Sequence, residues 1–443
     1  MDHALREAVA PQFTALHAVP DDRPALDLTC AVVGLGYVGL PTALGLCEAG
    51  SSVIGVDVDE QRLRRITEGE VDISARDRTR LKQVVDSAEL SLTNEAAALE
   101  KADVVIVCVP TPVDEHMVPD LSALRSAARA VVEHARAGQL IVLTSTSYVG
   151  STRDLIVEPL AGRGLAVGRD VNVAFSPERI DPGVDDHRPE STPRIVGGVT
   201  RDCTERAAAV LELTCPSVHQ VASPEIAEMA KLLENTFRAV NIALANEMAD
   251  IARDLRVPIS DVIDAAATKP YGFMAFRPGP GVGGHCIPCD PHYLTWQMRA
   301  SRHDTPLIDA AMTQIAGRPS RVVARIREML GDRGRAVSGS HVHVVGVAYK
   351  PGVADVRESP ALEIIEQLLV SGATVTFDDP LVETVRVHGE TLGRTRTSEL
   401  VHRPDLLLVH TRPAGMDVAE LAIADSVLDA TFELRGLEHR EVV

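Results

Sequence analysis

The sequence predicts an α/β fold in which two Rossmann-like, doubly wound domains are joined by a central helical domain with one long helix. Two strand–helix–strand patterns, one in each half of the chain, predict the Rossmann-like domains, and a helical repeat of about thirty residues between them predicts the long helix. We expect an N-terminal extension over 1–27, a first nucleotide-binding domain over 28–215, a central domain over 216–330, and a second Rossmann-like domain over 331–443.

Residues 28–58 contain a complete βαβ unit. An apolar strand is followed by the G-x-G-x-x-G sequence Gly34-Leu35-Gly36-Tyr37-Val38-Gly39, a helix of small residues, and a second strand that ends at Asp57. In such a unit Gly34 makes the turn, Gly36 lets a pyrophosphate approach the backbone, and Gly39 lets helix and strand pack. The Asp57 carboxylate can accept hydrogen bonds from both ribose hydroxyls of NAD and would repel the 2′-phosphate of NADP. The alternative is a glycine-rich turn without a ligand, but the whole pattern favours NAD as cofactor.

Further strands alternate with helices after this unit. Apolar runs predict strands within 103–112, 140–147, 171–179 and 194–199, and this alternation is typical of a parallel sheet. Ligand groups should gather at the carboxyl ends of these strands. The polar or turn-forming residues at those ends are Pro110, Thr111, Thr146 and Glu178.

The long helix begins after Ser223, which is followed by Pro and Glu as at many helix starts. Lys231 and Asn235 are four residues apart and therefore share one face of this helix. Solvated polar positions are the alternative interpretation of both. The chain has only five lysines among its 44 basic residues, and Lys231 is one of the three that lie within motif regions, where a lysine, unlike an arginine, can act as an acid or base. The apolar positions exceed one narrow stripe, so the helix can also carry a dimer contact.

Residues 341–380 repeat the strand–loop–helix–strand pattern without the glycine fingerprint. The loop holds Tyr349, Lys350 and Arg357, and Ser359 with Pro360 opens the following helix. Two nucleotide-type domains suggest two nucleotide ligands: NAD and a nucleotide attached to the substrate.

The stretch 279–290, GPGVGGHCIPCD, has three possible functions. His285, Cys286, Cys289 and His292 could bind zinc, although no second ligand pair appears. The two cysteines could be a thioredoxin-like pair, although glycine and proline dominate here. In the interpretation we favour, small neighbours expose Cys286 as a nucleophile that traps an aldehyde, which is oxidised to a thioester and hydrolysed to an acid. Asp290 could then assist the water. We expect no metal.

Composition excludes several classes of function. A net charge of −19 argues against nucleic-acid binding as the main activity. No apolar run approaches the roughly 20 residues that a membrane span needs, and the first 27 residues are not signal-like. Seven scattered cysteines indicate reduced thiols. We therefore expect a cytoplasmic protein without a membrane or nucleic-acid partner.

From about residue 28 to its end the chain resembles the UDP-glucose/GDP-mannose dehydrogenase family. The matching motifs, in order, are VVGLGYVGLP, VCVPTP, FSPERIDPG, EIAEMAKLLENTFRAVNIALANE, GPGVGGHCIPCDPHYL and GVAYKPGVADVRESPA. The stretches KPYGFMAFRPGPGVGGHC and PTPVDEHMVPDLS look most like the branch that acts on UDP-N-acetylglucosamine, with the UDP-N-acetylmannosamine branch a close second.

The resemblance implies a four-electron oxidation of C6 from alcohol to carboxylate with two NAD+, by a homodimer or a higher homo-oligomer. It implies that Cys286 is the nucleophile and that Lys231 stabilises an oxyanion and exchanges protons, while water and protons are positioned by Asn235, Thr146, Asp290 and Glu178. Besides the glycine turn, the implied cofactor residues are Asp57, Arg62, Val109, Pro110, Thr111, Thr146 and Arg357. The implied substrate residues are Glu178, Arg179, Ile180, Lys231, Asn235, Arg277, Gly279, Gly281, Gly283, Tyr349 and Lys350.

The chain departs from the family pattern at four places. It has Asp429-Ala430-Thr431 where relatives usually have Asp-Thr-Arg, and IAGRP where they often have Asn before Met-Pro. Cys289 stands where an apolar residue or lysine is common, and His292 where an aromatic residue is common. The implied catalytic set is intact, whereas the sugar specificity is not determined by these residues.

Overall fold

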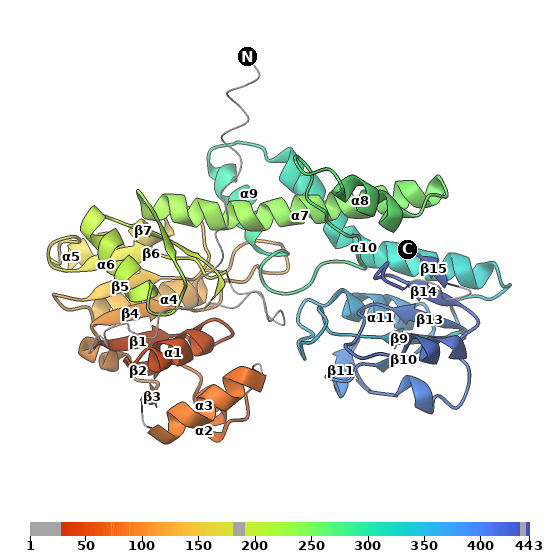
Figure 1. Ribbon diagram of the computed structural model, residues 1–443, viewed down its shortest axis with the longest axis horizontal. Coiled ribbons are helices and arrows are strands. Elements are labelled where there is room, and N and C mark those ends of the chain that lie inside the picture. The colour runs from red at the N-terminus through yellow and green to blue at the C-terminus, as the bar shows by residue number, and fades with distance from the viewer. Residues whose placement is uncertain (1–27, 72, 74, 88, 180–190, 435–439) are drawn as a thin grey trace, which may run out of the picture. The chain divides into compact units, whose positions relative to one another are not determined.

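The computed structural model describes the chain except for residues 1–27, 72, 74, 88, 180–190 and 435–439. The described chain forms two compact units (Figure 1). The first contains the residues up to Thr111 together with Leu121–Met229, and the second contains Pro112–Asp120 and Ala230–Val443. Ile180, one of the predicted substrate residues, lies outside the described residues.

The first unit is built on an eight-stranded sheet of order β3-β2-β1-β4-β5-β6-β7-β8. The predicted βαβ unit is confirmed as β1, α1 and β2, with Asp57 directly after β2. The elements of this unit are β1 Thr29–Val33, α1 Gly39–Glu48, β2 Ser52–Val56, α2 Glu60–Glu68, α3 Ala75–Ser87, β3 Leu90–Thr93, η1 Ala96–Lys101, β4 Val104–Val107, α4 Ser122–Glu133, β5 Leu140–Leu143, η2 Arg153–Val157, α5 Glu158–Gly162, β6 Asn172–Phe175, β7 Arg194–Gly198, α6 Arg201–Leu211 and β8 Val218–Val221.

The central strands of this sheet are buried on both faces. Every residue of β4 and β5 is buried, as expected of parallel strands that helices cover on either side. The sheet is parallel from β3 to β6, as predicted, but β7 runs antiparallel to β6. The run RIVGGV predicts the strand and not its direction, because the periodicity of side chains is the same in both directions.

The second unit contains a five-stranded parallel sheet of order β10-β9-β13-β14-β15 and a separate β11–β12 hairpin. The second Rossmann-like pattern is confirmed, and Ser359 caps α11 as predicted by accepting a hydrogen bond from the Ala361 N–H. Its elements are the greater part of α7 Pro224–Asp254, then α8 Ile259–Ala267, α9 Asp290–Ala300, α10 Pro306–Gly331, β9 His341–Val345, α11 Pro360–Val370, β10 Thr374–Asp378, β11 Thr384–Val387, β12 Glu390–Gly393, η4 Thr397–Glu399, β13 Leu406–Val409, η5 Val418–Ile423, β14 Val427–Asp429 and β15 Arg440–Val442.

The long helix α7 is one unbroken element of 31 residues (Figure 1). Ala239 and Ala243 on this helix pack against Met312 and Ile315 on α10. Farther along, α7, α8 and α10 share one hydrophobic core with the five-stranded sheet, so the helical segment and the second Rossmann-like sheet form one unit. The finer boundaries at 215/216 and 330/331 stay predictions. No helix in the described part of the chain combines the length and the apolar composition that a membrane crossing requires.

Candidate active site

The glycine turn of the first unit is shaped by contacts that exclude side chains. Gly34 has φ +86°, and a Cβ atom there would lie 2.8 Å from the Cys108 carbonyl oxygen. A Cβ atom on Gly39 would lie 1.8 Å from the Gly34 carbonyl oxygen, so the start of α1 can approach the turn only without a side chain. No described atom lies within 4 Å of the corresponding position at Gly36. The backbone of the turn is therefore open at Gly36 and closely packed at Gly34 and Gly39. A pyrophosphate needs such an open position to contact the backbone.

Asp57 and Arg62 both contact this turn. The Asp57 carboxylate accepts hydrogen bonds from the Leu35 N–H at 2.8 Å and from the Asp59 N–H at 3.0 Å. The Arg62 guanidinium donates to the Leu35 carbonyl oxygen. Among the described residues no side chain caps the N-terminus of α1, where Val38 is the N-cap. An anion bound at the turn can accept from these first N–H groups.

The loops that follow β4 and β5 are joined to each other. The Thr144 N–H donates to the Val107 carbonyl oxygen at 3.0 Å, and the Ser145 hydroxyl donates to the Val109 carbonyl oxygen at 2.8 Å. These bonds hold Val109 beside Gly34, since a Cβ atom on Gly34 would also lie 3.0 Å from the Val109 side chain. Pro110 is exposed, and Thr111 and Thr146 are half-buried. The predicted cofactor residues of the first unit thus gather at the carboxyl edge of its sheet, and Arg357 belongs to the second unit.

Glu178 has a buried charge partner that sequence reasoning missed. The antiparallel register pairs Ala174 with Gly198 and Phe175 with Gly197, and its continuation brings Glu178 opposite Arg194. Arg194 Nη2 lies 3.0 Å from Glu178 Oε2, and both side chains are nearly inaccessible. The Arg179 N–H also donates to Glu178 at 2.8 Å. Arg194 was not recognisable from the sequence, because the pair depends on the direction of β7.

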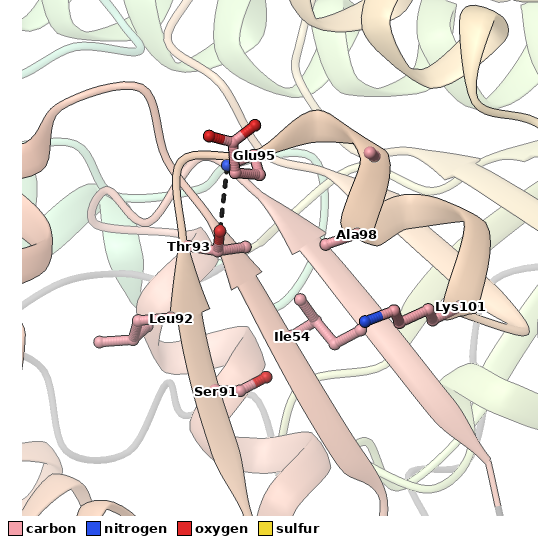
Figure 2. A pocket seen from close by; sticks show the side chains of 8 residues that line it. Ile54, Ser91, Leu92, Thr93, Glu95, Ala98 and Lys101 are labelled. Carbon is pink, nitrogen blue, oxygen red and sulfur yellow. Dashed lines mark hydrogen bonds between the residues drawn. The ribbon is translucent and has the colours of Figure 1, made fainter.

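A cavity of about 460 Å³ lies beside β2, β3 and η1 of the first unit. Figure 2 shows its lining, which includes Ile54 and Lys101 and in which the Thr93 hydroxyl accepts from the Glu95 N–H at 3.0 Å. None of the predicted cofactor residues lines this cavity. We therefore assign it no part in the candidate site.

In the second unit α7 and α9 bring three buried polar side chains together. Lys231 is 9% exposed, Asn235 5% and Asp290 3%, so the interpretation of the two α7 residues as solvated positions is wrong. The Asn235 amide donates to the Asp290 carboxylate. Burial raises the pKa of Asp290 to about 6, although the charge of Lys231 and the bond from Asn235 both oppose the rise. A carboxylate with a pKa near neutrality can take up and release a proton at physiological pH.

The raised pKa of Asp290 predicts a pH-dependent stability. Because its pKa rises from 3.8 in the unfolded chain to about 6 in the folded protein, the folded state binds the proton more tightly. The contribution of this proton to the free energy of unfolding is therefore full below about pH 4. It is lost as the pH rises through 6, which lowers the free energy of unfolding by about 3 kcal/mol. We expect Asp290→Asn to remove this loss. The free energy of unfolding, measured with urea, should then differ less between pH 4.5 and pH 7.5 in the variant than in the unsubstituted protein. The control is Asp261→Asn, at an exposed carboxylate on α8, which should keep the original difference. The same difference in Asp290→Asn would contradict the assignment.

The thiol loop ends at the start of α9. The Cys286 carbonyl oxygen accepts from the Cys289 N–H at 3.2 Å and from the Asp290 N–H at 2.8 Å, which forms a turn leading into the helix. Cys286 is exposed, whereas Cys289 is buried and burial raises its pKa to about 12. A ligand therefore reaches Cys286 and not Cys289. Among the described residues, which include all four side chains considered for zinc, no three His, Cys, Asp or Glu residues gather as metal ligands.

The glycines before Cys286 pack against the loop between β9 and α11 and against the start of α11. A Cβ atom on Gly283 would lie 2.6 Å from Tyr349 Cβ, and one on Gly281, where φ is +147°, would lie 2.7 Å from Pro360. The structure thus brings these glycines together with Tyr349 and the start of α11. Lys350 is half-buried in the same loop.

The predicted arginines of the second unit are held by carboxylates. Arg357 donates to both oxygens of Asp355, at 2.9 and 2.7 Å, and Arg277 donates to Asp264 at 2.6 Å. Burial, together with the charge of Arg357, lowers the pKa of His285. Both effects favour the neutral form of this histidine, which precedes Cys286 in the chain.

A second cavity, of about 680 Å³, is lined in part by the thiol loop. Val282 and Pro288 of the loop line it together with His292, Glu358 and Pro360. It does not contain the predicted catalytic or substrate residues. His292, one of the departures from the family pattern, therefore faces this cavity.

Three family models match the chain. The NAD binding domain of the UDP-glucose/GDP-mannose dehydrogenase family matches residues 28–214, the central domain of that family matches 225–314, and its UDP binding domain matches 343–430. These matches fall in both units described above and include the glycine turn, the thiol loop and the loop with Tyr349.

Curated relatives and solved structures agree with these matches. The chain is 36% identical over 360 residues to the UDP-N-acetyl-D-glucosamine 6-dehydrogenase of Pseudomonas aeruginosa, which covers 80% of this chain and 83% of that protein. It is 35% identical to the UDP-N-acetyl-D-mannosamine dehydrogenase of Escherichia coli strain K12, over 79% of this chain and 85% of that protein. The UDP-D-ManNAc dehydrogenase structure from Pyrococcus horikoshii matches with a TM-score of 0.84 and 31% identity, over 94% of this chain and 98% of that one.

Proposed function

The chain belongs to the UDP-glucose/GDP-mannose dehydrogenase family, and we propose that, as an NAD-dependent nucleotide-sugar dehydrogenase, it oxidises C6 of UDP-N-acetylglucosamine to the carboxylate. The observation that carries this proposal is the buried group of Lys231, Asn235 and Asp290, in which the Asp290 N–H bonds the carbonyl oxygen of Cys286, the residue with the exposed thiol. The reaction takes the primary alcohol, two NAD+ and one water, and gives the carboxylate, two NADH and three protons.

NAD, when bound, accepts one hydride in each of two steps. The Gly34–Gly39 turn would hold its pyrophosphate and Asp57 its ribose hydroxyls. Asp57 and Arg62 are already fixed at the turn, so the residues fit this cofactor.

The residues of the second unit would handle the sugar. In the first step Lys231 receives the proton of the C6 hydroxyl as the alcohol becomes an aldehyde. The Cys286 sulfur then bonds to the aldehyde carbon, the thiol proton passes to the aldehyde oxygen, and Lys231 stabilises the oxygen of this thiohemiacetal. In the second oxidation the thiohemiacetal loses a hydride from its carbon and the proton of its hydroxyl, which gives the thioester. Water then attacks the thioester, the C–S bond breaks, and the leaving sulfur takes up one proton, which restores the thiol. Asp290, held by Asn235, takes the proton of the attacking water.

By the family resemblance, Glu178 and Thr146 would position water and protons. The Glu178–Arg194 ion pair supports this role because it fixes the carboxylate at a strand end. Arg277, Gly279, Gly281, Gly283, Tyr349 and Lys350 would bind the nucleotide sugar.

UDP-N-acetylmannosamine and UDP-glucose are the alternative substrates, since a named relative acts on the first and the family name includes the second. The alternative of another class is a nucleotide-sugar binding protein without catalysis.

A substrate panel tests this proposal. The protein is incubated with NAD+ and, separately, UDP-N-acetylglucosamine, UDP-N-acetylmannosamine, UDP-glucose and GDP-mannose, and NADH is followed by absorbance. We expect two NADH per UDP-N-acetylglucosamine and the highest kcat/KM with that sugar. Faster oxidation of another sugar would move the assignment to that sugar, and cofactor binding without NADH from any of them would favour the binding protein. We place the reaction in the cytoplasm, and its product is a building block for polysaccharides.

We also propose a homodimer that covers one face of α7. Its exposed apolar side chains recur at helical spacing over more than four turns, at Leu233, Phe237, Leu244, Met248 and Ile251. The Phe237 ring contacts Phe276 edge-on, which extends the apolar surface beyond the helix. A second copy of the chain would bury this face by two-fold symmetry.

Charges on this face should separate the copies. We expect Leu244→Glu with Met248→Glu to halve the mass measured by light scattering. The control is Leu307→Glu, at an exposed leucine on α10, which should leave the mass unchanged. A monomeric unsubstituted protein would contradict the dimer.

A further inference from the structure

Gly279, the first glycine of the loop before Cys286, has both backbone polar groups bound by side chains from helices. The Asn246 side-chain oxygen on α7 accepts from the Gly279 N–H at 2.9 Å. The Nε atom of Arg318 on α10 donates to the Gly279 carbonyl oxygen, also at 2.9 Å. Asn246 is 5% exposed and Arg318 is 1% exposed, so water does not compete strongly for these bonds. Gly279 is therefore held from both sides.

Arg318 is held in turn by a carboxylate on α7. Its Nη1 atom donates to Asp250 at 2.7 Å, and the other oxygen of Asp250 accepts from Arg321. Arg321 is exposed and also donates to Gln314 at 2.7 Å. Within the described chain its side chain thus bonds two helices and not the loop. The two arginines share one carboxylate, but Arg318 alone of the two bonds the loop backbone.

Burying an arginine at this position costs more free energy than burying an apolar side chain would. Burial lowers the pKa of Arg318, and its Nη2 atom has no hydrogen-bond partner among the described residues. Replacing a buried ion pair by an apolar side chain of similar volume is often neutral or stabilising. Stability alone therefore does not explain the arginine.

We propose that Arg318 is a positioning residue that fixes the loop 277–284 for the nucleotide sugar. The loop is anchored at Gly279 by Arg318 and Asn246, and near Gly283 by its packing on Tyr349 and Pro360. Fixing both ends sets the backbone course of the intervening residues before the ligand binds. This inference rests on the proposed function only in naming the nucleotide sugar as the ligand of the loop.

Arg318→Met tests the proposal with Arg321→Met as the matched control. Hydrogen exchange in the ligand-free protein, measured by mass spectrometry, should be at least about fivefold faster over 277–284 in Arg318→Met, because one anchoring hydrogen bond to a charged group is lost. It should be unchanged in Arg321→Met. With the preferred sugar, KM should rise about tenfold in Arg318→Met while kcat changes less than about twofold. The melting temperature should stay the same or rise, because Asp250 keeps Arg321 as its partner.

Further outcomes separate positioning from a structural role. Arg318→Lys keeps one charged donor, so its KM should lie between those of the unsubstituted protein and Arg318→Met. Its hydrogen exchange over 277–284 should remain faster than in the unsubstituted protein. Unchanged exchange and unchanged KM in Arg318→Met would overturn the proposal, and so would equal effects in the two methionine variants. If no nucleotide sugar is oxidised by the unsubstituted protein, the proposed function fails, and the exchange measurement still decides whether Arg318 anchors the loop.

Discussion

Replacing Cys286 by serine is expected to lower kcat for the four-electron oxidation at least about a thousandfold, as removal of a catalytic nucleophile does in other enzymes. A serine hydroxyl is a far weaker nucleophile than a thiolate, so the aldehyde carbon would not be captured and oxidised as a thioester. NADH formation with the preferred sugar measures the loss. Titration calorimetry with NAD+ should give an unchanged Kd, because Cys286 is not among the predicted cofactor residues, all of which except Arg357 belong to the first unit.

The matched control is Cys289→Ser, three residues along the same turn. Cys289 is buried and burial raises its pKa to about 12, so this thiol is not available as a nucleophile. The control variant should retain turnover within about tenfold, the loss reflecting only local packing. Full activity of Cys286→Ser, or a larger loss in Cys289→Ser than in Cys286→Ser, would reject the thioester route.

Replacing Lys231 by methionine is expected to lower kcat by about a hundred- to ten-thousandfold, the range for loss of a positioned proton-transfer group. Methionine keeps much of the volume of the buried side chain but can neither take the hydroxyl proton nor stabilise an oxyanion. Steady-state NADH formation over a range of pH measures this effect. Asp290 would lose the nearby positive charge that now opposes the rise of its pKa, so its pKa should rise further.

The substitution Lys231→Arg separates the two roles of the lysine. A guanidinium at this position would keep the positive charge but would not release a proton, so the variant should remain slow if proton transfer is required. The control is Lys82→Met, at an exposed lysine on α3, which should leave kcat unchanged. A Lys231→Arg variant with nearly full kcat would assign the lysine to charge stabilisation alone.

Much of the fold follows from local patterns in the chain. The apolar strand, the glycine fingerprint and the strand ending before Asp57 lie within about thirty residues, so their meaning does not depend on distant contacts. The same holds for the cap at Ser359 and for the 31 residues of α7. The motif resemblance added the family, because long motifs in a fixed order restrict the possibilities far more than periodicity does.

Only part of the candidate site could be predicted from local sequence patterns. Its named residues came from motifs, but spacing alone could not decide whether Lys231 and Asn235 face water or the protein interior. Burial of both, and the bond from Asn235 to Asp290, depend on the packing of α9 against α7, since these two bonded residues are 55 positions apart. The exposed Cys286 and the buried Cys289 differ for the same reason, because only the folded turn gives two similar thiols different surroundings.

By itself the sequence determined that this protein has two Rossmann-like patterns, a long helix between them and a glycine- and proline-rich loop with two cysteines, since each is a property of neighbouring residues. The tertiary structure alone decided that β7 runs antiparallel to β6, that Glu178 therefore meets Arg194, and that Arg318 reaches Gly279. These are contacts between segments distant in the chain. Their formation depends on strand direction and helix packing, which the order of hydrophobic and polar residues along one segment does not contain.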